Sequence, residues 1–224
     1  MALTKFNYNS FDLTTAASKG LAFNSSANGF ETSSAGSMIL IKTLTASSSA
    51  TLSFVNGSSS VVLDNTYPVY LFKFINMHPA NDDAHFQFNM SVDAGSNYNV
   101  AKTSSFFRAF HTQTGGTSAL GYLTDNDEAQ GTGFQDLIEY GYNDATSSAS
   151  GTLYLFNPSS TTFVKHFIAD TQYRRSYSSQ NHASAINYAA GYGNTTSAVN
   201  GIQFKYASGD IDAGTIKLYG IKDS

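Results

Sequence analysis

The chain has 224 residues, no cysteine, only 12% charged residues and a formal net charge of −4. The absence of cysteine excludes a disulfide framework and a thiolate metal site, and a weakly acidic chain without a basic cluster argues against nucleic-acid binding. We also expect no membrane insertion, because no stretch approaches the roughly 18 apolar residues that cross a bilayer.

Serine, threonine, asparagine and glycine take the place of the missing charges, while hydrophobic residues make up 41% and aromatic residues 14%. That apolar content is enough for one core, and β-domains often run to about 200 to 250 residues as a single unit. A polar but mostly neutral surface favours close contact with neutral partners, because little ionic desolvation opposes it. Other protein subunits and sugars fit that description.

Residues 1–36 are rich in Ser, Asn and Ala and carry scattered aromatic anchors, of which Phe6, Tyr8 and Phe11 come first. We predict an irregular N-terminal arm that docks against the body or a neighbouring chain. The alternative is a disordered tail, although aromatic residues at this density favour docking. Residues 37–224 are predicted to form one β-sandwich domain.

The body shows the period-2 alternation of half-buried strands. Its clearest case is residues 85–92, where Phe86, Phe88, Met90 and Val92 share one face and polar residues the other. Short turn-rich segments separate such runs, which favours an antiparallel, jelly-roll-like β-sandwich. Strands are predicted at residues 37–45, 50–55, 69–75, 85–92, 105–111, 152–156, 163–168, 185–192, 201–206 and 214–221.

Two segments between these strands have their own predictions. Residues 46–49 are expected to form a turn. Residues 125–138 could begin a helix, with Asp125 or Asp127 as the cap, but Gly131 and Gly133 interrupt it. We therefore expect no more than a short helix there.

A faint internal repetition links residues 50–59 with residues 151–160, and residues 214–219 echo the same pattern. One explanation is convergence on good β-hairpin chemistry in a chain rich in Ser and Thr. The other is a pair of Greek keys, as in a jelly roll.

The sequence lacks the constellations that carry catalysis. There is no Gly-x-Ser-x-Gly elbow for a hydrolase, and only three glutamates are available for a glycosidase pair, whose separation one sequence cannot show. We predict no enzymatic activity and no cofactor.

Metal binding is not favoured either. The five histidines lack the spacing of compact metal sites, and His85 and His166 are expected on the polar faces of their strands. Acidic clusters at residues 81–83, 125–128 and 210–212 are interpreted as solvated turns, and whether one of them binds Ca²⁺ stays open.

Tyrosine is the most suggestive residue type, with 14 copies against no tryptophan. Tyr173, Arg174, Arg175 and Tyr177 are predicted to form a binding patch, since Tyr and Arg are enriched at binding hot spots. The alternative is that these tyrosines are half-buried strand residues with wet hydroxyls.

Residues 40–54, together with Gly214 to Gly220, resemble small structural proteins of tailed bacteriophages, marine ones in particular. The resemblance extends over roughly residues 37–221. It implies a jelly-roll-like virion component that assembles as a trimer and decorates the capsid or forms part of a fibre or tail. Residues 7–12 would then serve as an attachment segment, and no catalytic residue is implied.

Taken together, the residues and the resemblance predict a non-enzymatic virion structural protein that is assembled in the host cytoplasm. Its expected partners are further copies in a symmetric oligomer, a homotrimer, and other virion proteins. The alternative is a carbohydrate-binding, lectin-like module for adhesion to host surface glycans. A glycoside hydrolase or lyase is the third hypothesis.

Overall fold

The computed structural model describes residues 19–24, 26, 28–34, 37–178 and 181–222, without the side chains of residues 19, 33, 34, 176–178 and 181. This part of the chain is all-β and contains no helix, which confirms the predicted fold class. The strands are β1 (Lys19–Phe23), β2 (Phe30–Ser34), β3 (Met38–Ser49), β4 (Leu52–Val55), β5 (Val69–Pro79), β6 (Ala84–Ser91), β7 (Lys102–Thr112), β8 (Ser118–Tyr122), β9 (Ala129–Gly131), β10 (Gln135–Gly141), β11 (Ala149–Phe156), β12 (Lys165–Ser178), β13 (Asn181–Gly193), β14 (Gly201–Tyr206) and β15 (Ile211–Ile221).

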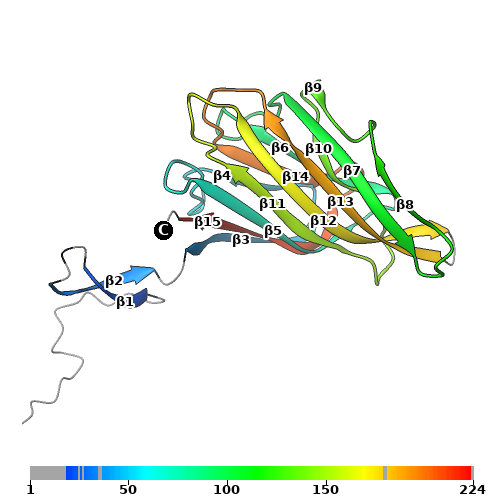
Figure 1. Cartoon of the computed structure of the whole chain (residues 1–224), viewed down its shortest axis with the longest axis horizontal. Helices are drawn as coiled ribbons and strands as arrows, with labels where there is room; N and C mark the ends of the chain where they lie inside the picture. Colours follow the sequence, from blue (N-terminus) through cyan, green and yellow to red (C-terminus); the bar gives the residue numbers. More distant parts are fainter. Residues whose placement is uncertain (1–18, 25, 27, 35–36, 179–180, 223–224) are drawn as a thin grey trace, which may run out of the picture.

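The strands form two facing sheets and a separate hairpin, and every ladder is antiparallel. The large sheet has the order β3-β15-β5-β11-β12-β13-β7-β8, with β9 beside β7. The small sheet has the order β10-β6-β14-β4. Figure 1 shows the large sheet in front of the small one.

The chain crosses repeatedly between the sheets. Each of the small-sheet strands β4, β6, β10 and β14 is preceded and followed along the chain by a strand of the large sheet. Strands β7, β8, β9, β12 and β13 widen the large sheet beyond β11. The large sheet is therefore broader than the layer that covers its inner face.

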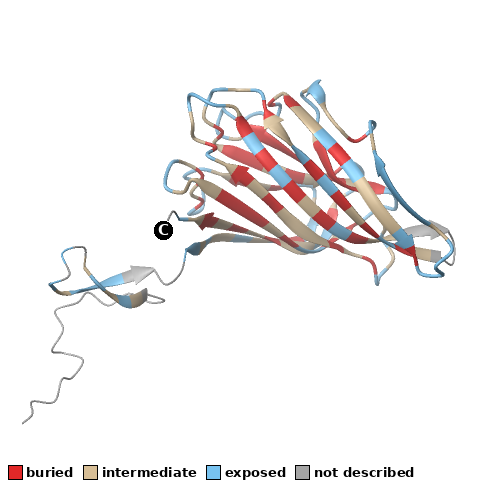
Figure 2. Ribbon diagram, viewed as in Figure 1, coloured by how far each residue is buried: buried red, intermediate tan, exposed pale blue. Residues whose placement is uncertain are grey.

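Aromatic side chains from both sheets fill the core. The ring of Phe204 on β14 lies 5.2 Å from that of Phe74 and 5.3 Å from that of Phe72 on β5, centroid to centroid. On β6, Phe86 and Phe88 are fully buried, as the alternation predicted. Burying rings of this size contributes much of the stability of a sandwich without disulfides. Figure 2 shows buried residues along strands of both sheets.

Two predictions about secondary structure were wrong. No helix forms at residues 125–138, where the structure has β9 and the start of β10, and Gln130 in the middle of β9 adopts a positive φ of 59°. The expected turn at residues 46–49 is the end of β3, because Ala46 and Ser47 pair with β15. Local turn residues in a Ser-rich segment were overridden by a neighbouring strand far along the chain.

Part of the predicted irregular arm is regular. Strands β1 and β2 form a hairpin in which the rings of Phe23 and Phe30 stack at 5.0 Å, and both side chains are exposed. Phe6, Tyr8 and Phe11 lie outside the described residues. Whether they dock stays a prediction.

Candidate functional site

The predicted binding residues lie on β12, where successive side chains point to opposite faces. Tyr173 points inward, is 1% exposed, and burial raises the pKa of its hydroxyl to about 12. Arg175 lies on the same side. Its guanidinium stands over the rings of Tyr140 at 4.6 Å and Phe110 at 5.7 Å, two cation–π contacts that hold it within the fold.

Arg174 points the other way. It donates hydrogen bonds to the hydroxyls of Thr146 and Ser147 and lies 3.8 Å from the carboxylate of Asp144. The side chain of Tyr177 lies outside the described residues. The structure thus distributes Tyr173, Arg174 and Arg175 over two faces of one strand, and their binding role stays a prediction.

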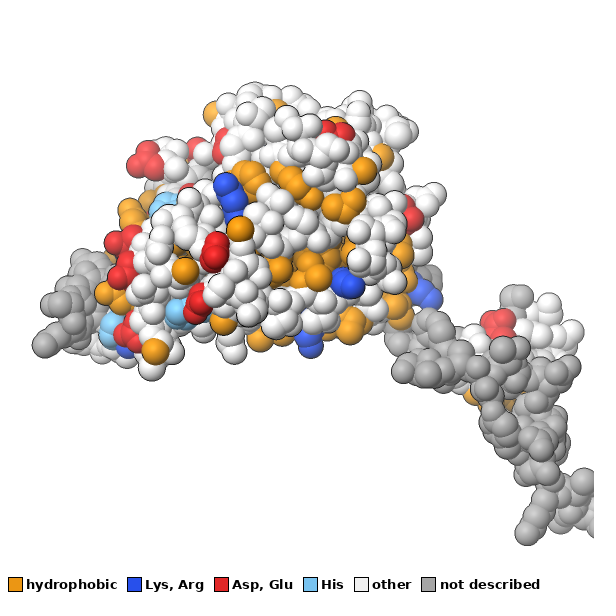
Figure 3. Space-filling view, turned by 180° about the vertical axis from the view of Figure 1, so that it is seen from behind, with side chains coloured by type: hydrophobic (Ala, Val, Ile, Leu, Met, Phe, Trp, Pro, Cys, Tyr) orange, Lys and Arg blue, Asp and Glu red, His pale blue; other side chains and the backbone are white. Residues whose placement is uncertain are grey.

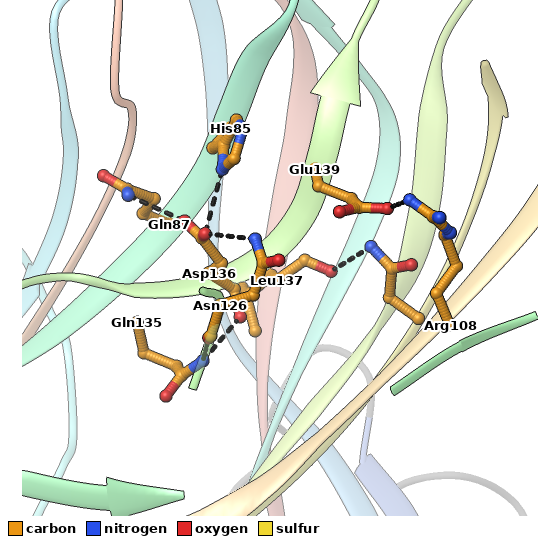
Figure 4. Close-up of polar contacts among 9 residues, drawn as sticks. His85, Gln87, Arg108, Asn126, Gln135, Asp136, Leu137 and Glu139 are labelled. Carbon is orange, nitrogen blue, oxygen red and sulfur yellow. Dashed lines mark hydrogen bonds and ion pairs between the residues drawn. The ribbon is translucent and has the colours of Figure 1, made fainter. Parts of the chain in front are cut away.

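A polar network covers the outer face of the small sheet. The carboxylate of Asp136 on β10 accepts hydrogen bonds from the side-chain amides of Gln87 and Asn126, both at 2.7 Å, and lies 2.9 Å from Nδ1 of His85 (Figure 4). This hydrogen bond raises the pKa of His85 more than burial lowers it. The network orients the imidazole of His85. Through Asp136, it also fastens the segment that contains Asn126 to β10 and β6.

A second set of polar contacts ties β10 to the large sheet. Glu139, with 4% of its side chain exposed, forms an ion pair with Arg108 on β7, and Figure 4 shows the two side chains facing each other. The backbone oxygen of Leu137 accepts hydrogen bonds from Thr171 at 2.6 Å and Asn187 at 3.3 Å. These contacts fix the edge of the small sheet against β7, β12 and β13.

The outer face of the large sheet is different, because apolar side chains stand there in cross-strand register. One row runs unbroken over six strands, and a second row lies beside it on four of them; within the rows, the rings of Tyr154 and Phe156 stack. At about 4.8 Å per strand, the longer row spans about 24 Å. We call these ten residues the apolar face: Leu40, Tyr219, Leu71, Tyr154, Ile168 and Ala190, with Met38, Ile221, Val69 and Phe156.

Several residues of the apolar face are open to solvent. Met38 is 43% exposed, and Leu40 and Ile168 are each 51% exposed. Contiguous apolar surface of this kind marks interaction sites on soluble proteins. No layer of the described chain covers it, since the small sheet packs on the opposite side.

An aromatic row, formed by Tyr122, Phe107 and Tyr188, lies on the same outer face toward the far edge of the large sheet. The rings of Phe107 and Tyr188 stack at 5.0 Å, and both side chains are about two-fifths exposed. Ser105 and Ala109, which flank Phe107 on the same face of its strand, have small side chains, so the ring of Phe107 protrudes from the sheet.

The predicted histidine and acidic positions do not converge. Among the described residues, no group of three or more His, Cys, Asp or Glu side chains could hold a metal ion. His78 lies 3.6 Å from Asp212 as a single pair, and Asp82 accepts a hydrogen bond from the backbone N–H of Asn143. Within the same part of the chain, no helix is long and apolar enough to cross a membrane.

Comparisons with protein-family models, curated proteins and solved structures find no match for this chain.

Sequence reasoning missed the apolar face, although a signal was present. In residues 69–75 and 152–156, consecutive apolar residues such as Leu153, Tyr154 and Leu155 replace strict alternation. A strand that is apolar on both faces is typical of burial on both sides. Asp136 and Glu139 gave no comparable signal, because their partners are distant in the sequence.

Proposed function

We propose that this chain is a non-enzymatic structural protein of a tailed-phage virion, an outer capsid decoration or a fibre or tail component. It works in a symmetric homo-oligomer, a trimer, in which copies meet through the apolar face. The observation that carries the proposal is this ordered, partly exposed apolar surface on the outside of a complete sandwich. A second copy is the occupant that we propose, because a face with few charges meets a similar face without ionic repulsion.

The strand order supports a jelly-roll assignment. Numbered one to eight along the chain, β3, β4, β5, β6, β10, β11, β14 and β15 give the order 1-8-3-6 in the large sheet and 5-4-7-2 in the small sheet. Two interleaved Greek keys produce these two sheets, and jelly rolls built this way are common in viral capsid proteins. Apart from the β1–β2 hairpin, the five remaining strands, β7, β8, β9, β12 and β13, are then insertions that widen the large sheet.

The β1–β2 hairpin supports a role for the arm in assembly. Leu21 is 55% and Phe23 68% exposed, so this two-stranded hairpin presents apolar side chains that its own strands do not bury. A two-stranded hairpin is marginal by itself in water. Contact with a neighbouring virion subunit would supply the missing apolar partner.

The oligomeric state of the purified full-length protein tests the proposal. We expect light scattering to give the mass of a trimer, and Ile168→Glu to shift it to a monomer with unchanged far-UV circular dichroism, since a buried unpaired charge opposes the interface. Thr43→Glu, on the outer face of the same sheet but outside the apolar face, is the matched control and should remain a trimer. A wild-type monomer at all concentrations contradicts the proposed interface.

Deletion of residues 1–36 tests the arm separately. The truncated chain should keep a folded body and lose incorporation into its particle. Unimpaired incorporation contradicts a role of the arm in attachment.

The aromatic row favours a second candidate function, a lectin-like module in host adhesion. Exposed rings on a flat sheet can stack on sugar faces, and the carboxylate of Asp170 lies beside Tyr188 in cross-strand register. A glycan array should then show binding that Tyr188→Ala abolishes and Tyr173→Ala, at a buried position, affects only through stability. Absence of binding to any host surface glycan contradicts this candidate.

A further inference from the structure

A buried lysine and a buried asparagine meet where the two sheets join. Lys102 is the first residue of β7 in the large sheet, and Asn89 lies on β6 in the small sheet; both residues are 0% exposed. Nζ of Lys102 lies 2.9 Å from Oδ1 of Asn89. Nζ also donates to the backbone oxygens of Val100 and Gly133.

The hydrogen bonds fix which way the amide of Asn89 points. Oδ1 accepts from Lys102 and from the backbone N–H of Met90 at 2.8 Å, whereas Nδ2 donates to the oxygens of Thr132 and Gly133 at 3.0 and 2.9 Å. Because donors surround one end and acceptors the other, the orientation is unambiguous. The carbonyl oxygen of the amide is thus directed at the amine of Lys102, and the carbon that an amine would attack lies one bond beyond that oxygen.

The same contacts suit an acyl transfer. The backbone N–H of Met90 points at the oxygen on which negative charge develops when an amine attacks Cγ, the role of an oxyanion-hole donor. The two carbonyls that hold Nδ2 position the leaving nitrogen. Fixed donors in a water-excluded site stabilise such charge far more than they would in water.

A carboxyl group acts on the same site. Glu128 exerts an electrostatic effect on Lys102, and its carboxylate packs so closely over Gly131 that a Cβ there would collide with it. Gly133, which accepts from both Lys102 and Asn89, would bring a Cβ to 3.0 Å from Oε1 of Glu128. Two glycines therefore leave space for this carboxylate beside the segment whose backbone oxygen at Gly133 binds the lysine and the amide.

We propose that Lys102 and Asn89 form an intramolecular isopeptide bond that covalently joins the two sheets. Glu128 takes a proton from the ammonium, the amine attacks Cγ of Asn89, and a new Nζ–Cγ bond forms. The Cγ–Nδ2 bond then breaks as Glu128 returns its proton to the leaving nitrogen, and the second proton of Nζ passes to the departing ammonia, which leaves as ammonium. The chain thus loses the mass of one ammonia molecule, no electrons are gained or lost, and no co-reactant is required.

The electrostatics of the site agree with this chemistry. Burial lowers the pKa of Lys102 to about 8, and burial raises the pKa of Glu128, against the opposing effect of Lys102. With a pKa of about 8, about one amine in ten is neutral at pH 7, whereas an ordinary lysine with a pKa of about 10.4 offers about one in 2,500. The site thus supplies a nucleophile and a proton carrier together.

The intact mass of the purified full-length protein tests the inference directly. We expect the mass of the sequence minus one ammonia, and a branched peptide that contains both Lys102 and Asn89 after proteolysis. A Lys102→Arg variant should have the full sequence mass and a lower melting temperature. Wild-type protein that keeps the full sequence mass, even after incubation at mildly alkaline pH, overturns the proposal.

Two further variants separate the crosslink from other events. Lys165 is the matched control, since it is also a buried lysine and its Nζ donates to the backbone oxygens of Phe163 and Thr195, so Lys165→Arg should keep the mass deficit. Glu128→Gln should slow bond formation by about 100-fold or more. A deficit that persists in Lys102→Arg, without a branched peptide, would identify cyclisation at an Asn-Gly pair instead and overturn the crosslink.

Discussion

The outer faces of the two sheets differ in whether their side chains find partners within the same chain. On the small sheet, Asp136 collects three polar partners, and β10 is fastened to the large sheet through Glu139. On the large sheet, Leu40 and Ile168 stand half exposed in ordered rows. Figure 3, which views the molecule from behind, shows charged side chains scattered among hydrophobic and neutral polar ones. A face whose polar groups are paired internally needs no partner, whereas exposed apolar rows gain free energy when another surface covers them.

The largest effect should come from breaking the ion pair that secures the small sheet. Arg108→Met leaves the carboxylate of Glu139 buried without its partner and should lower the free energy of unfolding by about 3 to 5 kcal/mol. Urea unfolding followed by circular dichroism measures this. On the large sheet, Lys73→Met removes a cation that only stands over the ring of Tyr219 and should cost about 1 kcal/mol or less. Equal losses in the two variants would remove the distinction between the ion pair that joins the sheets and the exposed outer face of the large sheet.

A second pair of substitutions compares one carboxylate on each sheet. Asp136→Asn replaces an acceptor of three hydrogen bonds with a group that also presents donors, and should cost about 2 to 3 kcal/mol. Asp170→Asn, at a half-buried position bonded to Thr152, should cost about 1 kcal/mol or less. Melting temperatures of both variants, measured beside the wild type, decide whether the network is as tightly coupled as its geometry indicates.

The smallest effect should be a pH dependence carried by His85. Its pKa is raised in the folded protein, so its contribution to stability is fully present below the ordinary histidine pKa of about 6.5 and is lost as the pH rises through the folded value. Urea midpoints across the neutral range should therefore fall with rising pH, and His85→Gln should reduce this slope. A slope that is unchanged in His85→Gln would assign the effect to another group.

The sequence predicts strands well where apolar and polar residues alternate. It predicts them less well where both faces of a strand are buried or a bulge interrupts the pairing. On β6 the alternation placed Phe86 and Phe88 correctly. On β10, residues 135–139 are all buried, and register shifts break the pairing with β6, so no period-2 pattern exists to detect. Strand β8 fails for the opposite reason, since all five of its residues are exposed.

The candidate site was less predictable than the fold. Tyr173, Arg174 and Arg175 are adjacent in sequence, and that adjacency suggested one patch, but strand geometry sends neighbours to opposite faces. The contacts of Asp136 with Gln87 and His85 span 49 and 51 residues. Such pairings follow from tertiary register, which local residue patterns do not contain.

Strand β3, the first of the sandwich domain, lies beside β15, the last strand, so the chain enters and leaves the domain at the same end. Met38 pairs with Ile221, and the backbone N–H of Lys222 donates to the oxygen of Ser37, so both ends of the sandwich domain leave from one corner. The turn that joins β7 to β8 lies at the far end (Figure 1). A subunit tethered by its arm would project this turn outward.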